Sequence, residues 1–199
     1  AFGIMVAMFP LAAVLASALP APLIRRFGAQ TVSLVGTIVL AVALGLAGFA
    51  PHVALFALAL FVGGFTDSIV DAAQNVHGLR VEDAGGRTII NSLHALWSLG
   101  ATLGGAAGAW AASVGVPLGW HLVTAGAVGV GLAVLATVLG RLPNGGRPEP
   151  LEEHHETPRL NRAAWALLLP LAVLAISGTL IEDIAANWAA LYLVQIAGV

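Results

Sequence analysis

The stretch FGAQTVSLVGTIVLAVALGLAGFAPHVALFALALFVGGFT, residues 27–66, contains no Asp, Glu, Lys or Arg. A helix needs about 20 apolar residues to cross the ~30 Å hydrocarbon core of a bilayer, so this stretch is long enough for two crossings. Pro51 and His52 provide the natural break between them. The stretch therefore predicts two membrane-spanning helices joined by a short turn, the second continuing past its acidic residues to about Gly78.

Further charge-free runs lie on both sides of this stretch, at residues 1–24, 88–140 and 163–181. The run 88–140 fits two helices, with Gly115 and Pro117 at the turn, and each of the other runs fits one. The whole chain is 59% hydrophobic and only 9% charged, whereas soluble domains are about 25% charged. The expected fold is therefore all-α, a polytopic membrane bundle of six spans. The alternating segments of a membrane barrel are absent from the sequence.

The basic residues of the chain are all arginines, and they fall in alternate connections between the predicted spans. They are Arg25, Arg26, Arg80, Arg87, Arg141, Arg147, Arg159 and Arg162. The connections around Pro51 and Pro117 contain no Arg or Lys. Cytoplasmic loops carry an excess of basic residues, so this pattern predicts a multi-pass protein of the inner or plasma membrane with its arginine-rich loops in the cytoplasm.

Residues 141–162, RLPNGGRPEPLEEHHETPRLNR, are polar and proline-rich. This composition predicts a solvated cytoplasmic linker between a first bundle (1–140) and a further helix (163–199). The adjacent histidines within Glu152–Glu156 have no fixed geometry there, so we expect no metal site. We also expect no cofactor and no nucleic-acid partner. Because residue 1 already lies in a hydrophobic run, we expect the chain to be a piece of a longer protein.

The third span carries carboxylates in a hydrophobic setting, within VGGFTDSIVDAAQNVHG, residues 62–78. Asp67, Asp71 and Asn75 are spaced i, i+4 and i+8, and Gln74 is at i+7, so they share one helical stripe. Two carboxylates one turn apart in a low dielectric cannot both ionise cheaply. An intramembrane carboxylate indicates a functional site, here a solute and proton pathway. The structural alternative is that these side chains anchor a neighbouring helix or a loop arginine.

The fourth span has a second polar stripe, formed by Asn91, His94, Ser98 and Thr102. We expect the first three to join the pathway. His94 has two open interpretations, a structural hydrogen-bond donor or a proton relay. The other side of this helix is rich in glycine, at positions 100, 104, 105 and 108, and such small-residue steps favour close helix packing.

The sixth span contains GTLIEDIAANW, residues 178–188. Glu182, Asp183 and Asn187 fall in its outer half. Either Glu182 or Asp183 is expected to face a wet cavity, and the alternative for the other acid is a charge at the edge of a loop. Trp188 is either an interfacial anchor or a stacking surface for a ligand ring. We include all four residues in the predicted pathway.

Six spans with a linker after the fifth, together with this carboxylate pattern, resemble the major facilitator superfamily. The resemblance implies helices two to seven of a twelve-helix carrier, with 141–162 as its central loop. The family's loop G-x-L-a-D-R-x-G-R-R is similar to APLIRRFGAQ at residues 21–30, where Arg26 and Gly28 match while Ala21 and Arg25 replace the glycine and the aspartate. By this resemblance Arg25 and Arg26 contact the cytoplasmic gate or anionic lipid.

Shorter motifs resemble the fucose-permease-like branch of that superfamily. They are DAAQN at 71–75, HALWSLG at 94–100 and GTLIEDIAANW at 178–188. In that branch the acidic residue of the first motif is implicated in sugar and proton coupling, which here falls on Asp71. The proline of the antiporter motif is absent after Gly100, which favours symport over drug export.

The expected function is secondary active transport of a small polar solute, a sugar for example, by alternating access with a proton as coupling ion. We expect a protein that works in the lipid bilayer as a monomer once full length, and not an enzyme. The alternatives are an intramembrane enzyme and a channel-type subunit. An enzyme would need a nucleophile in a glycine-rich turn, whereas Ser98 and His94 are only neighbours on one helix.

Overall fold

The computed structural model describes residues 2–140 and 162–192, without the side chains of residues 2, 4, 6, 162, 163, 175, 179 and 182–192. Every regular element in these ranges is an α-helix, which confirms the predicted fold class. The helices are α1 (Phe2–Ala16), α2 (Pro20–Phe27), α3 (Ala29–Gly48), α4 (Val53–Gly85), α5 (Ile90–Ser113), α6 (Leu118–Leu139) and α7 (Arg162–Tyr192). The chain divides into two compact units, Ala1–Pro150 and Leu151–Val199, and each is described by itself.

Proline and glycine set the ends of the helices in the first unit. Pro20 begins α2, where its missing N–H costs nothing, and α2 bends by 60° from α1. Gly86 follows α4 with φ of 60°, and Gly115 lies between α5 and α6 with φ of 74°. Glycine adopts this left-handed conformation without a steric penalty, so the turn predicted at Gly115 and Pro117 is confirmed.

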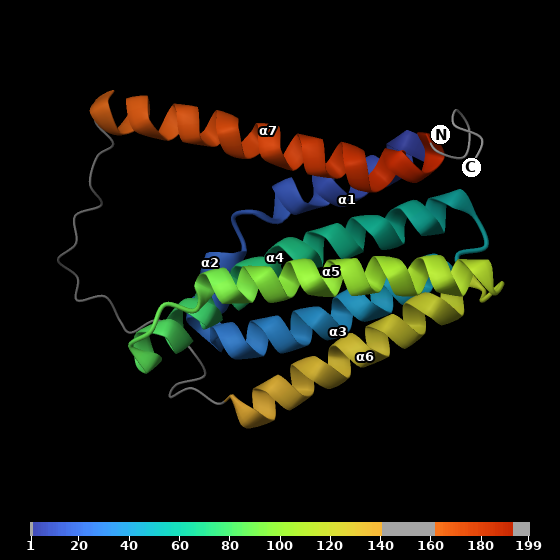
Figure 1. Cartoon of the computed structure of the whole chain (residues 1–199), viewed down its shortest axis with the longest axis horizontal. Coiled ribbons are helices and arrows are strands. Elements are labelled where there is room, and N and C mark those ends of the chain that lie inside the picture. Colours follow the sequence, from blue (N-terminus) through green and yellow to red (C-terminus); the bar gives the residue numbers. More distant parts are fainter. Residues whose placement is uncertain (1, 141–161, 193–199) are drawn as a thin grey trace. The chain divides into compact units, whose positions relative to one another are not determined.

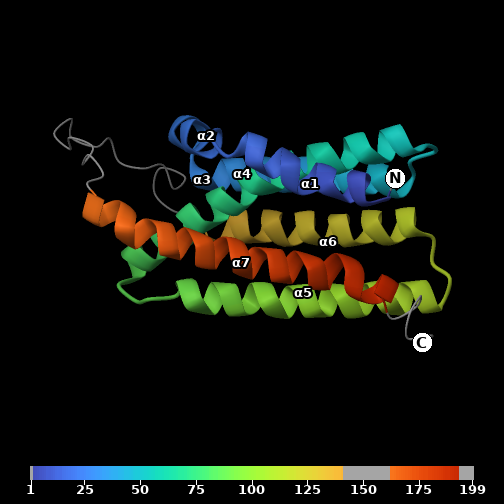
Figure 2. The ribbon, with the colours of Figure 1, turned by 90° about the horizontal axis from the view of Figure 1, so that it is seen from above.

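Four helices of the first unit form a layer in the order α1, α4, α3, α6, because α4 packs on both α1 and α3, and α3 packs on α6. The helix α5 runs alongside this layer, with sparse contacts to α4 and α6 (Figures 1 and 2). The connections α2–α3 and α4–α5 lie at the same end of the layer (Figure 1). The arginines among residues 2–140 are at or near these connections: Arg25 and Arg26 at the end of α2, Arg80 towards the end of α4, and Arg87 between α4 and α5. We call this end of the layer the arginine end.

The burial pattern reverses that of a water-soluble domain. The buried apolar residues are mostly small, such as Ala12, Ala43 and Ala73, while large ones such as Leu103 and Leu132 are exposed. Helices in lipid gain nothing from hiding leucine and pack instead through small residues. A Cβ added to Gly64 of α4 would collide with the backbone of Phe9 in α1, so these two helices approach closely.

Three of the described helices, α3, α4 and α6, are long and apolar enough to cross a membrane, and α1 with α2 provides a fourth if this bent pair is one span. The helix α5 has the length but carries the polar stripe of Asn91 and His94. In the second unit, α7 contains Pro170 and a shorter apolar stretch, Ala164–Gly178. The six stretches predicted as spans fall on α1 with α2, α3, α4, α5, α6 and α7, and of these α5 and α7 do not qualify as spans by length and apolar content over the residues that the structure describes.

Candidate functional site

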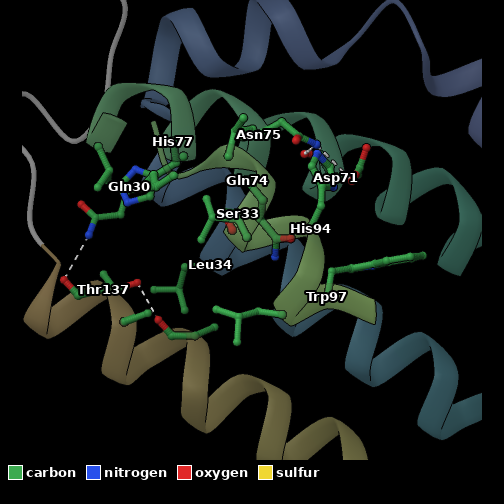
Figure 3. Close-up of a pocket in the computed structure, with 18 residues that line it drawn as sticks. Gln30, Ser33, Leu34, Asp71, Gln74, Asn75, His77, His94, Trp97 and Thr137 are labelled. Carbon is green, nitrogen blue, oxygen red and sulfur yellow. Dashed lines mark hydrogen bonds between the residues drawn. The ribbon is translucent and has the colours of Figure 1, made fainter. Parts of the chain in front are cut away.

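A half-open cavity of about 520 Å³, mostly apolar but with several polar groups in its lining, lies between α3, α4, α5 and α6 towards the arginine end of the first unit (Figure 3). Its lining combines carboxylate, imidazole, carboxamide, hydroxyl and indole groups with aliphatic side chains. The lining residues are Gln30, Ser33, Leu34, Asp71, Gln74, Asn75, His77, Gly78, Val81, Ile89, Ile90, Leu93, His94, Leu96, Trp97, Ala133, Ala136 and Thr137.

The α4 wall of the cavity holds the one carboxylate among these residues. The Asn75 side-chain amide donates to the Asp71 carboxylate at 3.2 Å and to the Asp71 backbone carbonyl at 2.9 Å. This pair spans one helical turn, and Gln74 and Gly78 lie on the same side of α4. The hydrogen bond orients the Asp71 carboxylate, whose second oxygen accepts no hydrogen bond from the described part of the chain.

The α5 wall presents His94 and Trp97 to the cavity. Trp97 is 60% exposed. The hydroxyls of this helix are occupied locally, because Ser98 donates to the His94 backbone carbonyl at 3.1 Å and Thr102 to the Ser98 carbonyl at 2.9 Å. The Ser98 hydroxyl therefore does not pair with the His94 ring as a nucleophile would with its base.

The α3 and α6 walls are joined by one side chain that was not predicted as a site residue. The Gln30 amide donates to the carbonyls of Thr137 and Gly140, at 3.1 and 3.4 Å. In Figure 3, Gln30 and Thr137 lie towards one end of the cavity and Asp71, His94 and Trp97 towards the other. His77 also lines the cavity, and its buried Nδ1 has no hydrogen-bond partner among the residues that the structure describes. A buried ring nitrogen without a partner is costly unless a ligand or water satisfies it.

The structure brings part of the predicted pathway together. Asp71, Gln74, Asn75 and His94 all line the cavity, whereas Asp67, Asn91 and Ser98 are not among its lining residues. Asp67 is half-buried in α4, one turn before Asp71. The backbone of α7 includes the other predicted positions, but the side chains of Glu182, Asp183, Asn187 and Trp188 lie outside the described residues.

The predicted gate residues Arg25 and Arg26 are exposed at the end of α2. The Arg26 guanidinium lies 5.2 Å from the centroid of the Phe27 ring, within the range of a cation–π contact. In the described ranges 2–140 and 162–192, no group of three His, Cys, Asp or Glu residues could hold a metal ion. The segment Glu152–Glu156 lies outside these ranges.

These features define a class first: a multi-pass helical membrane protein with a half-open cavity between its helices, lined in part by polar side chains. The family model described as Major Facilitator Superfamily matches residues 1–199. The chain belongs to this superfamily.

Two curated relatives are similar to the chain. An uncharacterized transporter of Sinorhizobium fredii is 32% identical over 204 residues, which cover 99% of this chain and 51% of the relative. An uncharacterized MFS-type transporter of Yersinia pestis is 31% identical over 102 residues, which cover 51% of this chain and 27% of the relative. The chain thus spans about half the length of the first relative, and its match to the second covers about a quarter of that protein. No solved structure matches it.

Proposed function

We propose that the full-length protein is a secondary active transporter that moves a small neutral polar solute by alternating access, in symport with protons. Membership of the superfamily and the transporter names of both relatives support transport. The single observation that carries the proposal is the cavity between α3, α4, α5 and α6, which is lined by a carboxylate that Asn75 orients. Polar groups inside a membrane bundle mark substrate and ion pathways.

The chemistry of the cavity favours a sugar or another polyol over a charged solute. Its described lining has no Arg or Lys that could hold an anion. Carboxamides and hydroxyls can donate to and accept from neutral hydroxyl groups. The exposed face of Trp97 suits the apolar C–H face of a sugar ring. The fucose-permease-like resemblance of residues 71–75 points to the same class of solute.

Asp71 is the proposed proton carrier. A carboxylate that gains a proton loses its charge, which changes the relative stability of the two conformations of a carrier. Asp67, Asn91 and Ser98, together with Glu182, Asp183, Asn187 and Trp188 of α7, complete the proposed pathway. Arg25 and Arg26 serve at the cytoplasmic gate or on anionic lipid. The protein acts as a monomer and has no enzymatic activity in this proposal.

Uptake by the full-length protein in proteoliposomes tests the function. With an inward proton gradient, neutral sugars or polyols should accumulate, and an entrapped pH dye should report proton entry in step with them. A protonophore should abolish the accumulation because it removes the driving gradient. A preference for sugar phosphates, or an absence of uptake for the whole panel, would contradict the proposal.

The proposed orientation places the arginine end in the cytoplasm of a cell with the protein in its inner or plasma membrane. A protease-sensitive tag inserted within residues 141–162 should resist external protease in intact cells and be cleaved after permeabilisation. A control tag between Val114 and Pro117 should show the opposite accessibility. Cleavage of the 141–162 tag in intact cells would reverse the orientation.

A further inference from the structure

The helix α5 forms one wall of the cavity but packs on its neighbours only near its ends. All residues from 91 to 107 are exposed. Near the first end, a Cβ added to Gly78 of α4 would lie 2.8 Å from the Leu93 side chain and 3.5 Å from that of Ile90. Near the far end, Ala111 is buried and Gly108 lies next to His121 of α6. The position of this wall therefore depends on how its ends are held.

The first turn of α5 is held by a carboxylate from another helix. The Glu82 carboxylate of α4 accepts hydrogen bonds from the backbone N–H groups of Ile89 and Ile90, at 2.7 and 3.0 Å. Ile89, the residue that precedes α5, makes no side-chain cap of its own. The initial N–H groups of a helix have no partner within it, and a negative charge there is favourable. Glu82 thus supplies the missing cap from α4.

The same side of α4 links this cap to the cavity. Asp71, Asn75, Gly78 and Glu82 are spaced i, i+4, i+7 and i+11, so they form one helical stripe. Asp71 and Asn75 line the cavity, Gly78 touches α5, and Glu82 holds its first turn. Between Glu82 and Ile89 the chain reverses through Gly86 in a left-handed conformation. The cap is therefore the polar link between α4 and α5 at the cavity's edge.

We propose that Glu82 is a positioning residue, which holds the start of α5 on α4 and so sets where His94 and Trp97 stand across from Asp71. The proposal rests on the transport function proposed above. Glu82 does not line the cavity, so its effect on a ligand passes through α5. To hold the first turn of α5, residue 82 needs an acceptor oxygen at the distance that the glutamate side chain provides. A negative charge on a shorter side chain does not suffice.

Three substitutions of Glu82 separate these factors in the full-length protein. Glu82→Gln keeps an acceptor oxygen at the same reach and should behave nearly as wild type. Glu82→Ala removes the acceptor, and Glu82→Asp keeps the charge but shortens the side chain by one methylene. Both should speed hydrogen exchange at the start of α5, with about tenfold faster exchange of the Ile89 and Ile90 amides. Asp83→Ala is the matched control, because Asp83 is the adjacent acid and is exposed.

Transport kinetics distinguish a positioning role from a general loss of structure. Glu82→Ala and Glu82→Asp should raise the apparent KM by about tenfold with a smaller change in maximal rate, as expected when a binding wall is misplaced. Equal effects of Glu82→Gln and Glu82→Ala, or a Glu82→Ala variant no different from Asp83→Ala, would overturn the proposal. The exchange measurement needs no transport, so wild-type protein without uptake would contradict the transport function while the Glu82 exchange result still stands.

Discussion

Replacing Asp71 with asparagine should lower proton-driven uptake of a sugar by about 100-fold, a size typical of strong coupling between two sites. Asparagine has nearly the shape of aspartate, and its carbonyl oxygen can still accept the hydrogen bond from Asn75 that the carboxylate accepts at 3.2 Å. It cannot gain or release a proton near neutral pH. The cavity should therefore keep its shape, while the transport of sugar is no longer coupled to the movement of protons.

The measurement compares two modes of transport in proteoliposomes. Uptake driven by an inward proton gradient should fall in Asp71→Asn, whereas exchange of labelled for unlabelled sugar without a gradient should stay close to wild type. Asp83→Asn is the control, since it removes an exposed carboxylate outside the cavity. Coupled uptake that survives in Asp71→Asn would remove Asp71 from the mechanism.

The helix positions could be predicted from the sequence because each helix that crosses a membrane needs enough consecutive apolar residues, which is a local property of the sequence. The predicted break at Pro51 and His52 falls between α3 and α4. The predicted end near Gly78 is seven residues short, because α4 continues to Gly85. Charged residues such as Arg80 show where lipid gives way to water, whereas a helix ends only where its backbone must turn, here at Gly86.

A bend inside the first span was also not predicted. The charge-free run 1–24 was interpreted as one span, but the structure divides it into α1 and α2 with a 60° bend. Pro20 lacks the N–H that would continue the helical hydrogen-bond pattern from α1, so it begins a new helix. The proline was visible in the sequence, but the hydrophobic pattern alone does not distinguish a kink from a break.

Of the predicted site residues that line the cavity, His94 is on α5 and the other three lie on a single helical stripe of α4. Asp71, Gln74 and Asn75 line the cavity together because helical periodicity is a local property. Gln30 and Thr137 were missed, since 107 positions separate the two residues and only tertiary packing brings them into hydrogen-bonding distance. Periodicity also placed Asp67 on the same stripe, but the cavity lies nearer the arginine end than that residue.

The glycines of α5 also show that a sequence pattern does not predict which helices pack together. Close packing was expected at Gly100, Gly104 and Gly105, but among the described residues nothing lies within 4 Å of a Cβ added there. The close approaches occur elsewhere, as between Gly48 of α3 and the backbone of Gly119 in α6. A small residue permits close packing, but which helix is adjacent decides whether packing occurs.

Among the described glycines, Gly64 is therefore the one at which we expect replacement by alanine to lower the stability of the protein most. A Cβ at this position would overlap the Phe9 carbonyl oxygen and lie 2.7 Å from the Phe9 carbonyl carbon. Backbone atoms cannot rotate away as a side chain can, so α1 must move off α4. Overpacking of this kind costs on the order of 3 kcal/mol, which exceeds the ~1 kcal/mol that alanine gains over glycine in a helix.

The matched control is Gly104→Ala, which makes the same chemical change in the middle of α5 where the added methyl meets open space. That variant should be as stable as wild type or more so, because it gains helix propensity without a collision. Thermal unfolding of the full-length protein in detergent compares the two, and Gly64→Ala should unfold several degrees lower. Equal unfolding temperatures for the two variants would show that α1 and α4 do not approach as closely as Phe9 and Gly64 do in this structure.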